Sequence, residues 1–188
     1  MGSHRFTKLL ALAVAALASY PAHAAAAAAD PVAARLLRAH NADRAAVGAA
    51  PLAWDPALAA GAAAWAQYMA ASGRFDHSDR KARPGIGENL WMGTRGAYSI
   101  ESMARQWTAE RRHFRPGIFP DNSRTGNWMD VAHYTQIIWP TTRRIGCALA
   151  SGRRSDYLVC RYSPKGNIDG RPLPPPPPPP TSPVERGR

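Results

Sequence analysis

Cysteine and lysine are scarce in this chain, and several signature motifs are missing. The chain has two cysteines in 188 residues, and only three of its 24 basic residues are lysines. No segment stays apolar over the ~20 residues that a membrane-spanning helix needs. HExxH, GxSxG and P-loop motifs are absent, and the GxG at residues 85–87 has Leu90 at the third glycine position. The sequence also has no zinc finger, helix-turn-helix or RNA-binding aromatic pattern, so we expect no nucleic-acid partner.

The length and composition predict one domain with appendages. A chain of 188 residues, 45% of them hydrophobic, can bury one core. Basic residues precede an apolar run at residues 9–17, and the small-residue pattern AHA follows at residues 22–24. This pattern predicts a secretory signal peptide at residues 1–24 and an Ala-rich spacer at residues 25–30. The alternative is a transmembrane helix, but the run is too short for a hydrocarbon core of ~30 Å.

Export would place the protein outside the cytosol, in an extracellular or periplasmic location. At the other terminus, residues 174–180 are seven consecutive prolines. We expect the domain to span residues 31–170, and residues 171–188 to form a proline-rich disordered tail. Such a tail adopts an extended polyproline II conformation, as a stiff spacer or as a ligand for a proline-recognising groove.

The charge of the chain is strongly positive, formally +11. Basic pairs occur at residues 111–112, 143–144 and 153–154, so an anionic surface is a candidate partner. Alternatively, the charge is spread over the whole surface and serves solubility. Both interpretations stay open at this point.

Helix signals occur four times along the chain. Asp30 and Pro31 predict the start of a helix that runs towards Gly48. The same Asp-Pro signal predicts a second helix from Pro56 to Gly73. Apolar spacing gives the second helix a buried face of Leu58, Ala62, Trp65 and Met69. A third helix is expected at residues 100–113 and a short fourth one at residues 130–139, which Pro140 stops. Strands are expected at residues 88–93, 145–150 and 156–162.

The last two predicted strands each contain one of the two cysteines. A hairpin that pairs symmetrically about residues 153 and 154 places Cys147 opposite Cys160, at a Cα separation of about 5 Å that a disulfide allows. An exported protein also keeps such a bond oxidised. Two buried thiols, or a cysteine nucleophile, remain the alternatives.

Glu110 is a site candidate from helical periodicity alone. It shares the apolar face of the third helix with Ile100, Met103 and Trp107. A carboxylate there must be ion-paired, hydrogen-bonded or bound to a metal, because burying an isolated charge is very costly. The simpler alternative pairs it with Arg111 or Arg115.

Two segments carry a family resemblance: AHYTQIIW at residues 132–139 and YLVCRYSPKGNI at residues 157–168. They resemble the two signatures of the CAP superfamily, which groups cysteine-rich secretory proteins, insect venom antigen 5 and plant pathogenesis-related protein 1. Residues 40–44 and 52–55 are similar to the family's first helix and its exit. The resemblance covers roughly residues 31–170. It implies an α/β fold, a three-layer α-β-α sandwich with a small antiparallel sheet.

The resemblance also implies a cleft formed by four residues: His77, Glu88, Glu110 and His133. Imidazole nitrogen and carboxylate oxygen are suitable ligands for a divalent cation such as Zn2+. The same motifs contain Asn89, Tyr134 and Gln136, which we expect to support the cleft.

The function that follows is a secreted binding protein with a divalent cation and a lipid-like or other small ligand. One alternative is a metal-dependent hydrolase acting on peptide or wall material, with Glu88 and Glu110 as the candidate catalytic residues. Another is a surface interaction module. The chain lacks the cysteine-rich extension of animal members, so functions tied to that extension are not expected here.

Overall fold

The computed structural model describes residues 31–173. The predicted signal peptide, the Ala-rich spacer and the seven prolines lie outside the described residues. The elements are α2 (Pro31–Ala46), β1 (Ala53–Trp54), α3 (Pro56–Ser72), η1 (Arg80–Ala82), β2 (Gly87–Thr94), α4 (Ile100–Thr108), η2 (Ala109–Arg112), β3 (Gly117–Ile118), η3 (Trp128–Val131), α5 (Ala132–Ile137), β4 (Arg144–Ser151), β5 (Ser155–Ser163) and β6 (Pro172–Leu173), where η marks a 3-10 helix.

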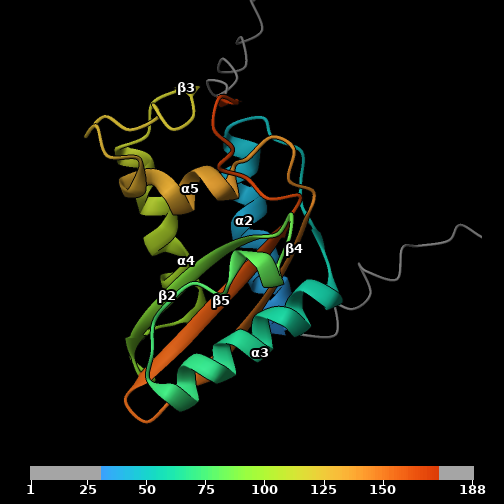
Figure 1. The fold of residues 1–188 in the computed structure, drawn as a ribbon, viewed down its shortest axis with the longest axis vertical. Helices are drawn as coiled ribbons and strands as arrows, with labels where there is room; N and C mark the ends of the chain where they lie inside the picture. The colour runs from blue at the N-terminus through green and yellow to red at the C-terminus, as the bar shows by residue number, and fades with distance from the viewer. Residues whose placement is uncertain (1–30, 174–188) are drawn as a thin grey trace, which may run out of the picture.

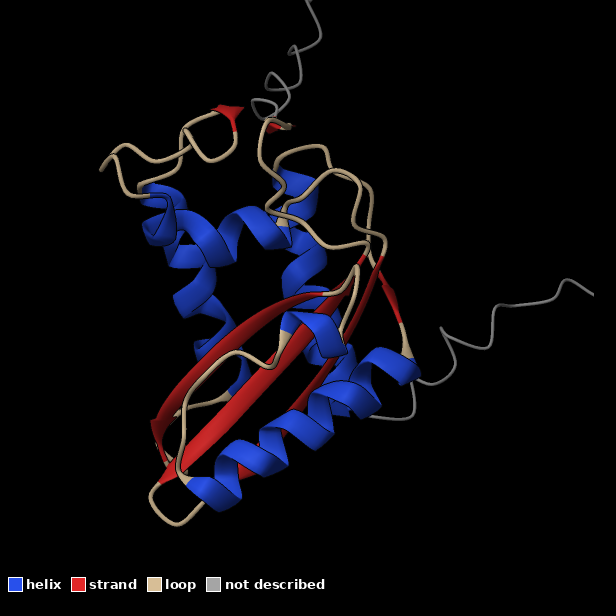
Figure 2. Cartoon of the chain, in the orientation of Figure 1, coloured by secondary structure: helices blue, strands red, loops and turns tan. Residues whose placement is uncertain are grey.

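A four-stranded sheet forms the middle layer of the molecule, in the order β1-β4-β5-β2. Helix α3 covers one face, and α2, α4 and α5 cover the other (Figures 1 and 2). The predicted α-β-α sandwich is therefore confirmed. Strand β1, which pairs in parallel with β4, was not predicted from the sequence because it has only two residues.

Two hydrophobic clusters lie on the two faces of the sheet. Leu90 and Val159 pack with α3, whereas Trp91 and Leu158 pack in the larger cluster with α2, α4 and α5. Consecutive strand residues face opposite sides, which explains this division. Gly146 lets α3 lie directly on β4, because a Cβ there would come within 2.1 Å of the backbone nitrogen of Ala59.

Helix α3 begins and ends as predicted. The Asp55 side chain accepts from the backbone N–H groups of Ala57 and Leu58, and Gly73 ends the helix in the left-handed conformation. Its buried face differs at one position. Ala66 is fully buried, while Trp65 is only half-buried and stacks on Tyr68. The indole is too large for the closely packed layer against the sheet, and an alanine takes the interior position.

The third and fourth helices are shorter than predicted. Helix α4 ends at Thr108, and the chain tightens into the 3-10 turn η2, a common way for a helix to finish. The fourth segment divides into η3 and α5, and α5 stops at Ile137, before Trp139 and Pro140. None of the helices in residues 31–173 combines the length and the apolar character needed to cross a membrane.

The β4–β5 hairpin has the predicted register. Cys147 lies directly opposite Cys160, and the two form a disulfide with a Cα separation of 4.1 Å. The sequence prediction placed residues 171–173 in the tail, but Pro172–Leu173 pairs with Gly117–Ile118, and Leu173 is buried in the main cluster. Burial of the apolar Leu173 side chain stabilises this pairing relative to a segment that stays in solvent.

Arg44 is a fully buried cation with no carboxylate partner among residues 31–173. Its guanidinium donates to four backbone carbonyls, those of Ala50, Ile137, Trp139 and Thr142, at distances of 2.6–3.0 Å. Burial lowers the pKa of Arg44 to about 10, so the group stays charged at neutral pH. It thereby joins α2 to the end of α5 and to the segment that leads into β4.

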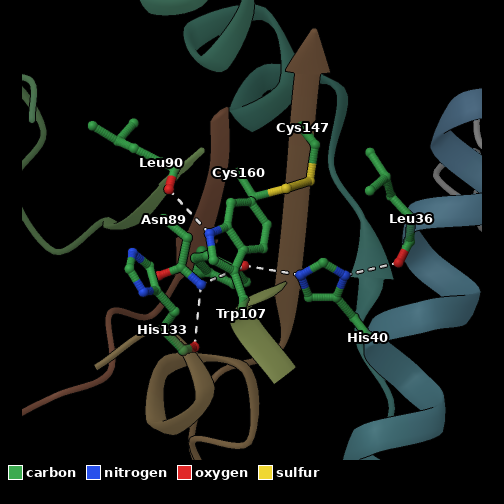
Figure 3. Close-up of a disulfide and its surroundings, with 9 residues drawn as sticks. Leu36, His40, Asn89, Leu90, Trp107, His133, Cys147 and Cys160 are labelled. Atoms are coloured by element: carbon green, nitrogen blue, oxygen red, sulfur yellow. Dashed lines mark hydrogen bonds between the residues drawn. A yellow bond between two sulfur atoms is a disulfide. The ribbon is translucent and has the colours of Figure 1, made fainter. Parts of the chain in front are cut away.

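A buried hydrogen-bond chain runs from α2 to α5 through two strands (Figure 3). His40 Nδ1 lies 2.8 Å from the carbonyl oxygen of Leu36, which can only accept, so Nδ1 carries the proton. Nε2 then accepts from the Tyr162 hydroxyl at 2.9 Å. The same hydroxyl oxygen accepts from Asn89 Nδ2, which also donates to the His133 carbonyl. Neutral His40 is thus the form that fits the chain.

Arg44→Met should destabilise the protein by about 3 kcal/mol or more. The four backbone carbonyls lose their donor but stay buried and polar, because a side-chain substitution cannot remove them. Urea unfolding monitored by circular dichroism measures the change. Arg38→Met, which removes an exposed arginine from the same helix, is the matched control and should alter stability by less than about 0.5 kcal/mol. Equal stability of the two variants would contradict the role assigned to Arg44.

His40 should make the fold sensitive to mild acid. Burial lowers its pKa to about 4, against about 6.5 in an unfolded chain. The unfolded state therefore binds a proton first, and stability falls by about 3 kcal/mol as pH drops from about 6.5 to about 4. In His40→Gln this part of the pH dependence should disappear, whereas His113→Gln should keep it. Identical pH slopes for all three proteins in urea titrations would refute this assignment.

Candidate functional site

Strand β2 places two polar residues next to each other on opposite faces of the sheet. Glu88 lies on the face that α3 covers, opposite Arg161 of β5. Asn89 lies on the other face, where it bonds to Tyr162 and to the first turn of α5. Because β2 is an edge strand, groups from both faces can reach its edge.

The Glu88 side chain is completely buried, and donors occupy both of its oxygens. Oε1 accepts from His77 Nδ1 at 2.9 Å and from the Ser78 backbone N–H at 3.0 Å. Oε2 accepts from the Ser78 hydroxyl at 2.6 Å and from Arg161 Nε at 3.3 Å. Arg83 Nε lies 3.6 Å from Oε1 and adds a second positive charge.

These partners decide the charge of Glu88. Burial alone would raise its pKa, but the hydrogen bonds from His77 and Ser78 and the charge of Arg83 together lower the pKa to about 2. The carboxylate is therefore ionised and can only accept. His77 Nδ1 must then carry the proton of this hydrogen bond, so Nε2 is the ring nitrogen that this pairing leaves for another partner. More than half of the His77 side chain is exposed to solvent.

Glu110 and His133 form a second pair of the same kind. Glu110 Oε1 lies 2.6 Å from His133 Nδ1, and Oε2 accepts from the backbone N–H groups of His133 and Tyr134. The Glu110 carboxylate thus caps the N-terminus of α5, where the helix dipole favours a negative charge. Among residues 31–173, the alternative pairing of Glu110 with Arg111 or Arg115 does not occur. The His133 ring stacks on Trp107, with 6.0 Å between the ring centroids.

The three expected supporting residues all have structural partners. Asn89 holds the backbone of His133, as described above. Tyr134 packs edge-on against Phe114, and the Gln136 side chain accepts from the Gly166 backbone N–H at 2.9 Å. Gln136 also explains the glycine before Glu88, since a Cβ at Gly87 would lie 2.1 Å from its side-chain oxygen.

The structure thus assembles the four predicted residues as two His–Glu pairs, one on each side of β2. Within residues 31–173, no group of three or more His, Cys, Asp and Glu side chains is arranged to hold a metal ion. A direct four-ligand site stays a prediction. In both pairs the carboxylate binds Nδ1, and Nε2 is the nitrogen left for another partner.

Sequence reasoning missed the residues that hold Glu88 in place. Ser78 and Arg161 both contact its carboxylate, and Arg83 donates to the Ser78 hydroxyl at 2.9 Å. Arg161 could have been found, because the strand register places it directly opposite Glu88. Ser78 and Arg83 lie in a loop, where no periodicity indicates the direction of a side chain.

A separate pocket of about 520 Å³ lies between α2 and α4. Four alanines, Thr108 and the buried His40 line it, together with four charged residues: Asp43, Glu101, Arg105 and Arg111. An ion pair between Arg35 and Glu101 connects the two helices beside it. Burial raises the pKa of Asp43. None of the four predicted cleft residues lines this pocket, although η2, which carries Glu110, borders it.

Known proteins share both the sequence pattern and the fold. A PR-1 type pathogenesis-related protein from Sambucus nigra is 35% identical over 134 residues, which cover 71% of this chain and 76% of that protein. Pathogenesis-related protein 1C from Nicotiana tabacum is 33% identical over 136 residues, covering 72% and 76%. Venom allergen 5 from Vespa magnifica is 30% identical over 131 residues, covering 65% and 54%.

Solved structures agree with this likeness. Na-ASP-1 superimposes with a TM-score of 0.63 at 26% identity, covering 76% of this chain and 41% of that one. NaASP2 gives the same TM-score at 24% identity and covers 74% and 82%. Residues 37–162, two thirds of the chain, match the CAP family, described as the cysteine-rich secretory protein family. The chain therefore belongs to the CAP family.

Proposed function

We propose that this chain is an exported binding protein in which His77 and His133 together hold one divalent cation such as Zn2+, and in which the pocket between α2 and α4 takes a lipid-like or other small ligand. The cation proposal rests on one observation: in both His–Glu pairs, the histidine Nδ1 is hydrogen-bonded to the carboxylate. Histidines that bind metals in proteins almost always donate their other ring N–H in this way, because the acceptor sets the tautomer and the orientation of the ring.

In this proposal the two glutamates orient the histidines instead of binding the cation. Both Glu88 oxygens already accept two hydrogen bonds each, and the side chain has no exposed surface. A metal bound directly to Glu88 would have to displace these donors. Two imidazole ligands from the protein leave further coordination positions for water or for a ligand.

The edge position of β2 supports a site shared by the two pairs. Glu88 and Asn89 are consecutive in β2; Glu88 holds His77, and Asn89 holds the backbone of His133. One short stretch of backbone therefore ties both histidines to the same strand. NaASP2, which is similar in fold, was crystallised with Zn2+. The proposal for this chain stands on its own residues.

Charge and shape suggest an amphipathic small ligand for the α2–α4 pocket. Its volume lies within the range of small-molecule sites. The alanines offer an apolar wall. Glu101 is already paired with Arg35, and the charge of Asp43 faces that of Arg111, which leaves Arg105 as the lining cation that forms no ion pair within residues 31–173. A hydrocarbon body with a small anionic head fits this distribution.

Binding is favoured over hydrolysis because the carboxylates are occupied. A general base needs a lone pair free to take a proton from water or substrate. Protein donors occupy all four lone-pair positions of Glu88 and three of the four of Glu110. The metal-dependent hydrolase is therefore the less supported alternative.

Zinc titration of the purified chain by calorimetry should show one Zn2+ per chain. His77→Ala and His133→Ala should each lower the affinity at least tenfold, because both imidazoles contact the same ion. Glu110→Gln should lower it about 10- to 100-fold, since it weakens the acceptor behind His133.

His113→Ala is the matched control, because it removes a histidine outside the two pairs, and its zinc affinity should equal that of the wild type. Thermal unfolding of each variant checks that the fold is kept. Absence of heat in the wild type, or loss of binding in only one of the two histidine variants, would end the shared-site proposal.

The pocket can be tested with cis-parinaric acid, a fluorescent fatty acid. Ala42→Trp adds a large ring at the rim of the pocket and should lower the affinity for this probe at least fivefold. Ala45→Trp, at an exposed position of the same helix outside the pocket, should leave the affinity unchanged. A wild-type protein that does not enhance the fluorescence, or equal effects of the two variants, would remove the ligand from the proposal.

A further inference from the structure

Three turns meet at the end of the sheet where β2 and β4 finish. They are the exit of α3 at residues 72–76, the β2–α4 turn at residues 94–99 and the β4–β5 turn at residues 151–155. The backbone N–H of Arg95 donates to the Arg154 carbonyl at 2.9 Å, and Gly152 lies against the backbone of Ala70 in α3. Figure 1 shows these segments together at the lower end of the molecule. We call this surface the arginine end.

Arginines dominate the charge of the arginine end. Arg74, Arg95, Arg153 and Arg154 are all exposed, and the same segments with their flanking strand residues contain two aspartates. Asp76 pairs with Arg74, and buried Asp156 accepts from Gly96 and Ser151. Among the described residues, Arg95, Arg153 and Arg154 form no ion pair. Three arginines without an ion pair in the described residues are therefore exposed on this surface.

Aromatic side chains stand beside these arginines. Tyr68, Phe75 and Tyr98 have 44%, 43% and 42% of their surface exposed. Tyr68 stacks on Trp65, and Tyr98 packs edge-on against Trp91, so two of the three rings are held in place by indoles. The exposed ring of Phe75 has no polar group to interact with water.

We propose that the arginine end docks the protein on the surface of an anionic phospholipid bilayer. Guanidinium groups bind the phosphate headgroups, and tyrosine and phenylalanine rings enter the boundary between headgroups and acyl chains. A soluble polyanion would satisfy the arginines equally well but would offer nothing apolar to Phe75. The combination of unpaired arginines with an exposed phenyl ring is what favours the bilayer.

Co-sedimentation of the purified chain with vesicles tests the proposal. The chain should pellet with vesicles of phosphatidylglycerol and phosphatidylcholine and remain in solution with phosphatidylcholine alone, and added salt should weaken the binding. In the double variant Arg153→Gln/Arg154→Gln, the affinity should fall about 25-fold, at about fivefold for each arginine. Phe75→Ser should lower it several-fold and leave the salt dependence unchanged.

The matched control removes the same charge elsewhere. Arg38→Gln/Arg112→Gln changes two exposed arginines in α2 and η2, neither of which lines the α2–α4 pocket, and should bind the anionic vesicles like the wild type. Equal losses in the two double variants would mean that net charge alone attracts the protein, and would overturn the proposal. So would tight binding to dextran sulfate together with an unchanged vesicle affinity in Phe75→Ser, because the partner would then be a polyanion.

Discussion

The buried Glu88 carboxylate is the interaction on which the arrangement of the site depends. An ionised group without exposed surface requires donors at both oxygens, and the fold supplies them from a loop on one side and from β5 on the other. In the loop after α3, Ser78 donates to this carboxylate, and Arg83 donates to the Ser78 hydroxyl and to the Ile86 carbonyl. His77 is placed at the surface as a consequence, with its tautomer already decided.

The register between β2 and β5 is equally important, because consecutive residues of a strand face opposite sides. A slip of one residue would exchange the environments of Glu88 and Asn89, placing the carboxylate against Tyr162 and the amide among the arginines. Apolar pairs on both faces oppose such a slip, and the neighbouring hairpin is tied by the disulfide. The sheet therefore specifies the two His–Glu pairs through one alignment.

The sheet also separates three regions of the molecule. The His–Glu pairs lie where β2 begins, the α2–α4 pocket lies on the face of the sheet opposite α3, and the exposed arginines lie at the turns between strands. Buried polar groups join the first two regions, since His40 belongs both to the pocket wall and to the hydrogen-bond chain that reaches His133.

Local patterns in the sequence were sufficient for much of this protein. Proline and aspartate caps located α2 and α3, the symmetry of the hairpin predicted the Cys147–Cys160 disulfide, and the motifs around the four polar residues indicated the family. Such features depend on neighbours a few residues away, or on a pattern that a whole family shares. The two-residue strand β1 and the buried Leu173 escaped prediction because their partners are distant in the chain.

Only the tertiary structure decided how the four polar residues are used. It paired His77 with Glu88 and Glu110 with His133, and it brought Ser78, Arg161 and backbone N–H groups to the carboxylates. Within the described part of the chain, Nε2 of each histidine has no hydrogen-bond partner. Hydrogen bonds depend on direction and on distances of about 3 Å, which residues far apart in the chain acquire only after packing.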